Sequence, residues 1–244
     1  MSVGWTWLLS VSREPLSLSA VFASSVASSA LGVGSAALLP LFVWEFDGKP
    51  GVAVFTVYLL FQNISKLALF WREIDWYVGR RLLLWAAPAA AAGSLLLLML
   101  PEAWFRQILG VCILLLITLP ALPLPDLPST VQLPVFGLFY GLCSGALGSG
   151  NVVKGPLLLS AGLVKERYIA TYALSSLAMN LPKILIYGVG GLTPSHLLGR
   201  GALLLVASLD GSWAGKRLLV AIPARWFARV VTGVCVLSAL LLLV

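Results

Sequence analysis

Two asparagine–lysine pairs lie inside long apolar stretches of this sequence, where charged side chains are rare. The pairs are Asn63 with Lys66 and Asn180 with Lys183. Their spacing of three residues places both side chains of a pair on one face of a helix. Because an amide beside an ammonium group can bind an anion, the pairs predict a polar, positively charged lining. The alternative is that each lysine reaches the membrane surface along its own apolar stem.

Two glycine-rich breaks interrupt the apolar stretches that precede these pairs. A helix that restarts after such a break directs free N–H groups and its positive dipole end toward a ligand. Irregular backbone at membrane depth is tolerated only where protein or a water-filled cavity surrounds it. The alternative is that glycine permits close helix packing. The residues that we expect to form two facing anion-binding sites are Gly32, Gly34, Ser35, Gly148, Ser149, Gly150 and Asn151.

Three further polar residues are candidates for the same cavity. Lys154 follows the second break and adds a positive charge that the first break lacks, since Leu38 stands at the matching place. Thr171 precedes Asn180 and could offer a hydroxyl, although threonine in membrane helices often bonds to the backbone. Asp210 is the one carboxylate well inside an apolar segment. It could couple transport to a proton gradient, or it could pair with a basic residue a turn or two away.

The composition predicts a protein that lies in a membrane. Hydrophobic residues make up 60% of the chain, charged residues 10%, and the mean hydropathy is +1.00. A soluble domain carries about 25% charged residues because they coat its surface. The net charge of +7 does not indicate nucleic-acid binding, because the basic residues form no run and sit at the edges of apolar segments.

The sequence offers no support for catalysis or for a cofactor. The three cysteines are far apart and have neither metal-ligand spacing nor the even count of a disulfide framework. No phosphate-binding loop, zinc-protease motif or dinucleotide-binding fingerprint is present. We therefore predict that the chain is not an enzyme and binds no metal.

Eight apolar segments predict an all-α polytopic membrane protein. Most have about the 20 residues that a helix needs to cross the bilayer. The first and fifth are too long and are broken by glycine, so each could cross or re-enter. The segments are Leu16–Trp44, Gly51–Phe70, Leu82–Leu100, Trp104–Leu119, Val131–Leu163, Tyr168–Val189, Leu197–Gly215 and Trp226–Val244.

The two halves of the chain match each other. Gly32 aligns with Gly148 at an offset of 116, and Asn63 with Asn180 at an offset of 117. The match predicts a first repeat at 1–122, a Pro-rich linker at 123–130 and a second repeat at 131–244, each with four apolar segments.

Two orientations of the repeats are open. If all eight segments cross, the repeats are parallel; if segments one and five re-enter, the repeats are inverted. We favour inversion, because it gathers nine basic residues on one face and leaves four on the other, a usable bias for orientation. The nine are Arg72, Arg80, Arg81, Lys165, Arg167, Lys216, Arg217, Arg225 and Arg229.

The chain resembles the sulfite exporter TauE/SafE family of bacterial membrane permeases over nearly its whole length. The resemblance is clearest in the run from Gly141 to Gly150, continues through Pro156 to Leu159, and includes Ile74-Asp75-Trp76. At the breaks, Gly34-Ser35-Ala36 and Gly150-Asn151-Val152 stand where the family usually shows three glycines. The resemblance implies transport of sulfite, sulfonates or related organosulfur anions across the bacterial inner membrane.

These observations together favour a multi-pass secondary transporter for a small anion. Alternating access would arise from one repeat rocking against the other. Its partners would be the anion and the lipid bilayer, not nucleic acid, and a homo-oligomer is left open. A passive anion channel and a membrane scaffold or assembly protein without flux are the alternatives.

Overall fold

The computed structural model describes residues 19–32, 35–46, 48–102, 104–105, 107, 129–148, 150–192 and 197–241. These residues form helices and short connections, and no strand occurs among them. In chain order the helices are Ser19–Leu31, η1 (Ser35–Leu38), α2 (Leu39–Glu45), α3 (Lys49–Phe70), η2 (Trp71–Glu73), α4 (Trp76–Met99), α6 (Ser129–Leu147), α7 (Asn151–Ser160), α8 (Lys165–Val189), α9 (Leu197–Ala221) and α10 (Ala224–Leu241).

Three stretches are long and apolar enough to cross a membrane, judged by length and composition. They are Lys49–Glu73, Trp76–Met99 and Lys165–Val189. At about 1.5 Å of rise per residue, each spans a hydrocarbon core of about 30 Å. The prediction of an all-α membrane protein is therefore confirmed for the described part of the chain.

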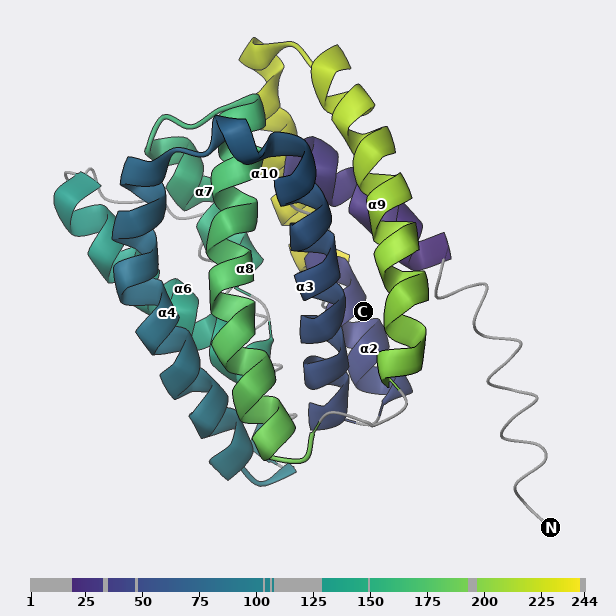
Figure 1. Ribbon diagram of the computed structural model, residues 1–244. Helices are drawn as coiled ribbons and strands as arrows, with labels where there is room; N and C mark the ends of the chain where they lie inside the picture. Colours follow the sequence, from purple (N-terminus) through teal and green to yellow (C-terminus); the bar gives the residue numbers. More distant parts are fainter. Residues whose placement is uncertain are drawn as a thin grey trace.

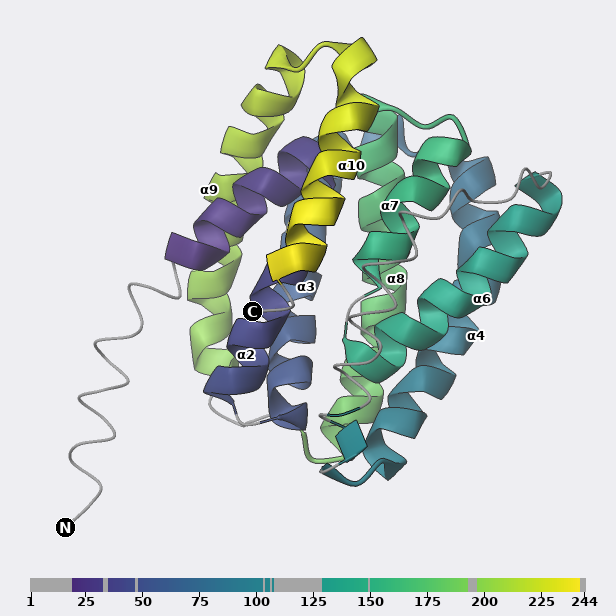
Figure 2. The same cartoon turned by 180° about the vertical axis from the view of Figure 1, so that it is seen from behind.

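Four long helices lie side by side in the order α4, α8, α3 and α9 (Figure 1). The two central helices, α8 and α3, are antiparallel (Figure 1). The two outer helices, α4 and α9, are also antiparallel to each other. Seen from behind, α6, α7, α2, α10 and the Ser19–Leu31 helix lie across the row (Figure 2). The fold thus places α3 and α8, which carry the two asparagine–lysine pairs, next to each other at the centre of the row.

Both overlong apolar segments are divided into separate helices. The first becomes the Ser19–Leu31 helix followed by η1 and α2, and the fifth becomes α6 followed by α7. Gly32 ends the first of these helices with φ of 76°, and Gly148 follows α6 with φ of 81°. Residues with a side chain rarely adopt this left-handed conformation, so glycine is required at both breaks.

Two seams of small residues bring helix backbones into direct contact. A Cβ atom on Gly141 would lie 2.2 Å from the Ala86 carbonyl oxygen of α4, and one on Gly145 would lie 2.1 Å from the Ala90 carbonyl oxygen. Gly215 of α9 meets the Ser19–Leu31 helix in the same way, 2.4 Å from the Val26 carbonyl oxygen. Close packing of this kind replaces the hydrophobic effect, which does not drive helix association in lipid.

Two helix boundaries lie well outside the predicted apolar segments. The α4 helix begins at Trp76, not at Leu82, because the Asp75 carboxylate accepts hydrogen bonds from the backbone N–H groups of Tyr77 and Val78, each at 3.1 Å. This cap starts the helix ahead of the apolar segment that the sequence predicted. The α9 helix also runs past the predicted end at Gly215, to Ala221.

Candidate anion-binding site

Three lysine side chains are almost completely buried in the middle of described helices. Lys66 on α3 is 1% exposed, and Lys154 on α7 and Lys183 on α8 are both 0% exposed. No aspartate or glutamate is buried among the residues whose burial is described. A buried charge without a partner costs several kcal/mol, so the cluster is costly unless an anion balances it.

Lys66 is held by the helix before the first break. Its Nζ donates to Ser28 Oγ at 2.8 Å and to Gln62 Oε1 at 3.4 Å. Gln62 Nε2 in turn donates to Tyr58 Oη, which donates to Ser24 Oγ at 2.9 Å. One face of α3 thus presents a continuous buried polar row to the Ser19–Leu31 helix.

Lys183 is held in the corresponding way by the helix before the second break. Its Nζ donates to Ser144 Oγ at 3.3 Å and to the Gly148 carbonyl oxygen at 3.0 Å. It also donates to Asn180 Oδ1 at 3.3 Å, so the predicted pair is in contact. Each lysine therefore bonds to a serine that precedes the break glycine by four residues in the sequence.

Lys154 connects the two halves of the cluster. Its Nζ donates to the Tyr172 carbonyl oxygen at 3.1 Å and to Ser176 Oγ. The same nitrogen lies 3.5 Å from the centroid of the Tyr172 ring, and Lys66 Nζ lies 5.5 Å from that centroid. Lys154 also interacts electrostatically with both Lys66 and Lys183. The three ammonium groups therefore form one cationic cluster.

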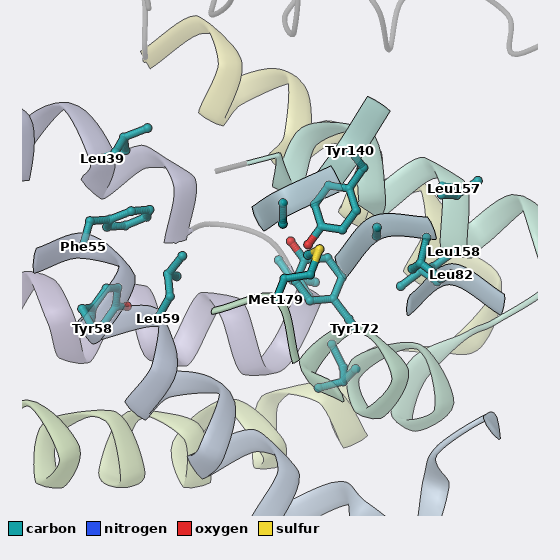
Figure 3. Packing of buried hydrophobic residues seen from close by; sticks show 14 of the residues in the cluster. Leu39, Phe55, Tyr58, Leu59, Leu82, Tyr140, Leu157, Leu158, Tyr172 and Met179 are labelled. Atoms are coloured by element: carbon teal, nitrogen blue, oxygen red, sulfur yellow. The ribbon is translucent and has the colours of Figure 1, made fainter. Parts of the chain in front are cut away.

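Aromatic side chains pack around this cluster. The Tyr140 ring of α6 is 5.1 Å from Lys154 Nζ, on a helix other than the one that carries Tyr172. Figure 3 shows Tyr140 and Tyr172 close to Met179 within the buried apolar packing. The negative faces of such rings attract cations and partly replace water around the buried ammonium groups.

The two predicted asparagines each leave one amide atom unused. Asn63 and Asn180 are both 2% exposed. Asn63 Nδ2 donates to the Leu59 carbonyl oxygen at 2.6 Å, while Asn63 Oδ1 and Asn180 Nδ2 have no hydrogen-bond partner in the described structure. Buried polar atoms are almost always satisfied by protein, water or a ligand. These atoms therefore have capacity for a further partner.

The two helix breaks face helices of the opposite half. A Cβ atom on Gly32 would lie 2.3 Å from Tyr168 Cε1 of α8, and one on Gly148 would lie 2.7 Å from Val52 Cγ1 of α3. Ser35 is buried at the start of η1, Gly150 is buried, and Asn151 begins α7. Gly34 and Ser149 lie outside the described residues.

The remaining two candidates lie apart from the lysine contacts. Thr171 Oγ1 accepts a hydrogen bond from the Asp75 backbone N–H at 2.9 Å, which ties α8 to the α3–α4 connection. Asp210 is exposed on α9 and forms no ion pair with a described residue. Neither side chain is in hydrogen-bond contact with the cluster, so their roles stay predictions.

Sequence reasoning did not select several residues that contact the lysines. Ser28 and Ser144 could have been selected from the sequence, because each lies four residues before the break glycine of its own half. Gln62 also had a signal, since it lies one turn before Lys66. Tyr172 and Ser176 had none, because only the packing of α7 against α8 brings them to Lys154.

Long apolar helices are typical of a membrane protein, and cations buried among such helices are typical of a functional site. The sequence model of the family described as Sulfite exporter TauE/SafE matches residues 16–242 of the 244 in the chain. The chain therefore belongs to the sulfite exporter TauE/SafE family, a membrane transporter family for sulfite or related anions. No curated protein and no solved structure matches the chain. Among the described residues, no cluster of histidine, cysteine or acidic side chains could hold a metal ion.

Proposed function

We propose that this chain is a secondary transporter that binds a small organosulfur anion, such as sulfite or a sulfonate, at the buried lysine cluster. The observation that carries the proposal is the burial of Lys66, Lys154 and Lys183 without a buried carboxylate among the described residues. An anion would balance these charges and would accept charge-assisted hydrogen bonds from them.

The geometry of the donors suits an anion with several oxygens. Lys66 and Lys183 approach from α3 and α8, and Lys154 approaches from α7. The unused amide N–H group of Asn180 adds a neutral donor nearby on α8. Sulfite and sulfonates carry three oxygens, so donors from different helices could each reach one. The backbone at Gly148 and Gly150 would supply further N–H groups.

We place the cluster between two inverted repeats, 1–122 and 131–244, joined by the linker 123–130. Three relations support this arrangement. The α3 and α8 helices run in opposite directions (Figure 1). Lys66 with Ser28 corresponds to Lys183 with Ser144. Gly32 packs on Tyr168 as Gly148 packs on Val52, and these partners are also 116 residues apart.

Alternating access follows from this plan. In this proposal the divided first and fifth segments re-enter the membrane, and their breaks meet the anion near its middle. One repeat then rocks against the other and opens the cluster to each side in turn. The protein would act as a multi-pass protein of the bacterial inner membrane.

The test is counterflow in liposomes that contain the purified protein. Labelled sulfite, sulfoacetate, taurine and sulfate are compared for saturable exchange. Saturable exchange of sulfite or a sulfonate that is lost in Lys66→Met and in Lys183→Met supports the proposal. Lys216→Met is the matched control, since this lysine lies outside the cluster and bonds to the Leu69 carbonyl oxygen at 3.0 Å.

Three outcomes would overturn the proposed carrier function at the lysine cluster. Flux that rises linearly with anion concentration would indicate a channel. Wild-type rates in both lysine variants would remove the cluster from the transport path. Absence of flux for every anion, from protein shown to be folded, would leave the lysines as structural groups and favour a scaffold.

A further inference from the structure

An open hollow lies at the start of α4, far from the contacts of the lysine cluster. Trp76, Tyr77, Arg80 and Arg81 line it, and its empty volume is about 730 Å³. Trp76 with Arg80 and Tyr77 with Arg81 are each four residues apart, so the members of each pair lie on the same face of α4. The surface that faces the hollow is almost wholly apolar, so it comes from the rings and the carbon stems of the arginines.

The two guanidinium groups are positioned by the rings. Arg81 Cζ lies 4.2 Å from the centroid of the Tyr77 ring, and Arg80 Cζ lies 5.7 Å from that of the Trp76 ring. A ring face attracts a nearby guanidinium group, whose N–H groups can still donate hydrogen bonds to an anion.

These guanidinium groups lack an anionic partner within the described structure. Neither forms an ion pair there, and Arg81 Nη1 is buried without a hydrogen-bond partner. The neighbouring Asp75 carboxylate is already used, since it pairs with Arg167 Nη2 at 2.7 Å and caps α4. A buried donor without a partner is rare in native proteins, so Arg81 points to a ligand that is an acceptor.

The hollow lies at the level expected for lipid headgroups. Trp76 and Tyr77 are 53% and 59% exposed at the end of a membrane-spanning stretch, where aromatic residues mark the interface. The same end of the molecule (Figure 1, top) carries three more pairs of arginine and tryptophan, which are Arg72 with Trp71, Arg217 with Trp213 and Arg229 with Trp226.

We propose that the hollow receives the glycerol and upper acyl chains of an anionic phospholipid, whose phosphate group lies beside the two guanidinium groups. The two arginines would grip the phosphate oxygens, and the ring faces would pack against the glycerol and upper acyl chains. Two positive charges favour a headgroup with net negative charge over a zwitterionic one. The site is independent of the proposed transport function, because it shares no contact with the three buried lysines.

The test measures lipid binding to the purified full-length chain by native mass spectrometry in detergent. The probes are phosphatidylglycerol, phosphatidylcholine and inorganic phosphate. Arg80→Gln/Arg81→Gln is compared with Arg225→Gln/Arg229→Gln, which removes the same charge at the same end without touching the hollow. We expect the first variant to bind phosphatidylglycerol about tenfold more weakly and the second to bind like the wild type.

The outcomes separate a specific site from general attraction. Equal losses in the two double variants, or equal binding of both lipids, would overturn the proposal. Competition by millimolar inorganic phosphate would assign the hollow to a free anion and would also overturn it. Tyr77→Leu keeps both charges and should still weaken phosphatidylglycerol binding, which provides a test if the double arginine variant fails to fold. Transport is not measured, so failure here leaves the proposed function untouched.

Discussion

Lys154 Nζ lies 3.5 Å from the centroid of the Tyr172 ring, so an aromatic face stands where a buried lysine would ordinarily find a carboxylate. A desolvated cation–π contact contributes about 2 kcal/mol. Removing an ammonium group from water costs more than that. The contact therefore positions Lys154 without balancing its charge, and it leaves that charge for another partner.

The first prediction concerns Lys154→Leu, which copies Leu38 of the first half. Because the change removes a buried charge, we expect an unchanged or higher Tm together with loss of anion counterflow. Thermal unfolding in detergent and flux in liposomes are measured on the same preparation. Lys216→Leu is the control and should keep its flux. Full flux in Lys154→Leu would show that the third charge is not needed.

The second prediction concerns the serines that hold the other two lysines. Ser28→Ala and Ser144→Ala each remove one hydrogen-bond acceptor and leave the charge in place. A hydrogen bond to a charged group contributes about 1.5–3 kcal/mol, so the KM for the anion should rise by about ten- to a hundredfold. Saturation of counterflow measures this. If the two serine–lysine pairs are equivalent, the two variants should behave alike; a loss in one alone would show that only one pair contributes to anion binding.

The third prediction concerns the seam between α4 and α6. Gly141→Ala places a methyl group 2.2 Å from the Ala86 carbonyl oxygen, which is backbone and cannot move aside easily. We expect a lower Tm by several degrees, because the helices must separate. Gly188→Ala is the matched control, since nothing lies within 4 Å of its added atom. Equal Tm values would contradict the close approach.

The fourth prediction separates the two roles of Asp75. Asp75→Ala removes both the α4 cap and the ion pair with Arg167, whereas Arg167→Gln removes the ion pair alone. A cap contributes about 1 kcal/mol and an exposed ion pair about 0–1 kcal/mol. Asp75→Ala should therefore lower Tm more, and only the effect of Arg167→Gln should vanish in high salt. A larger loss from Arg167→Gln would reverse this ranking.

Local sequence signals predicted the features of this protein that arise within a single helix. The apolar lengths predicted α3 and α8, and the spacing of Asn180 and Lys183 predicted a contact that the structure contains. The start of α4 was missed, because the capping power of Asp75 depends on backbone geometry rather than on hydropathy. Thr171 was selected for its hydroxyl, but the sequence could not reveal that the Asp75 amide bonds to it.

The sequence predicted a shared cavity for Lys66, Lys154 and Lys183, but it did not predict the side chains that surround them. Those surroundings arise from contacts among α3, α7 and α8. No local rule links Tyr172 to lysines on two other helices. The repeat of Ser28 and Ser144 before the break glycines was readable, but only the structure shows which groups they bond.

The glycine seams have a mechanical consequence. Where two backbones touch with no side chains between them, sliding would force main-chain atoms into each other. This is the case where Gly141 of α6 meets α4 and where Gly215 of α9 meets the Ser19–Leu31 helix. Each of these two helix pairs is therefore expected to move as one rigid unit. Displacement is left to the surfaces where long, bendable side chains intervene, and Lys66, Lys154 and Lys183 lie on those surfaces.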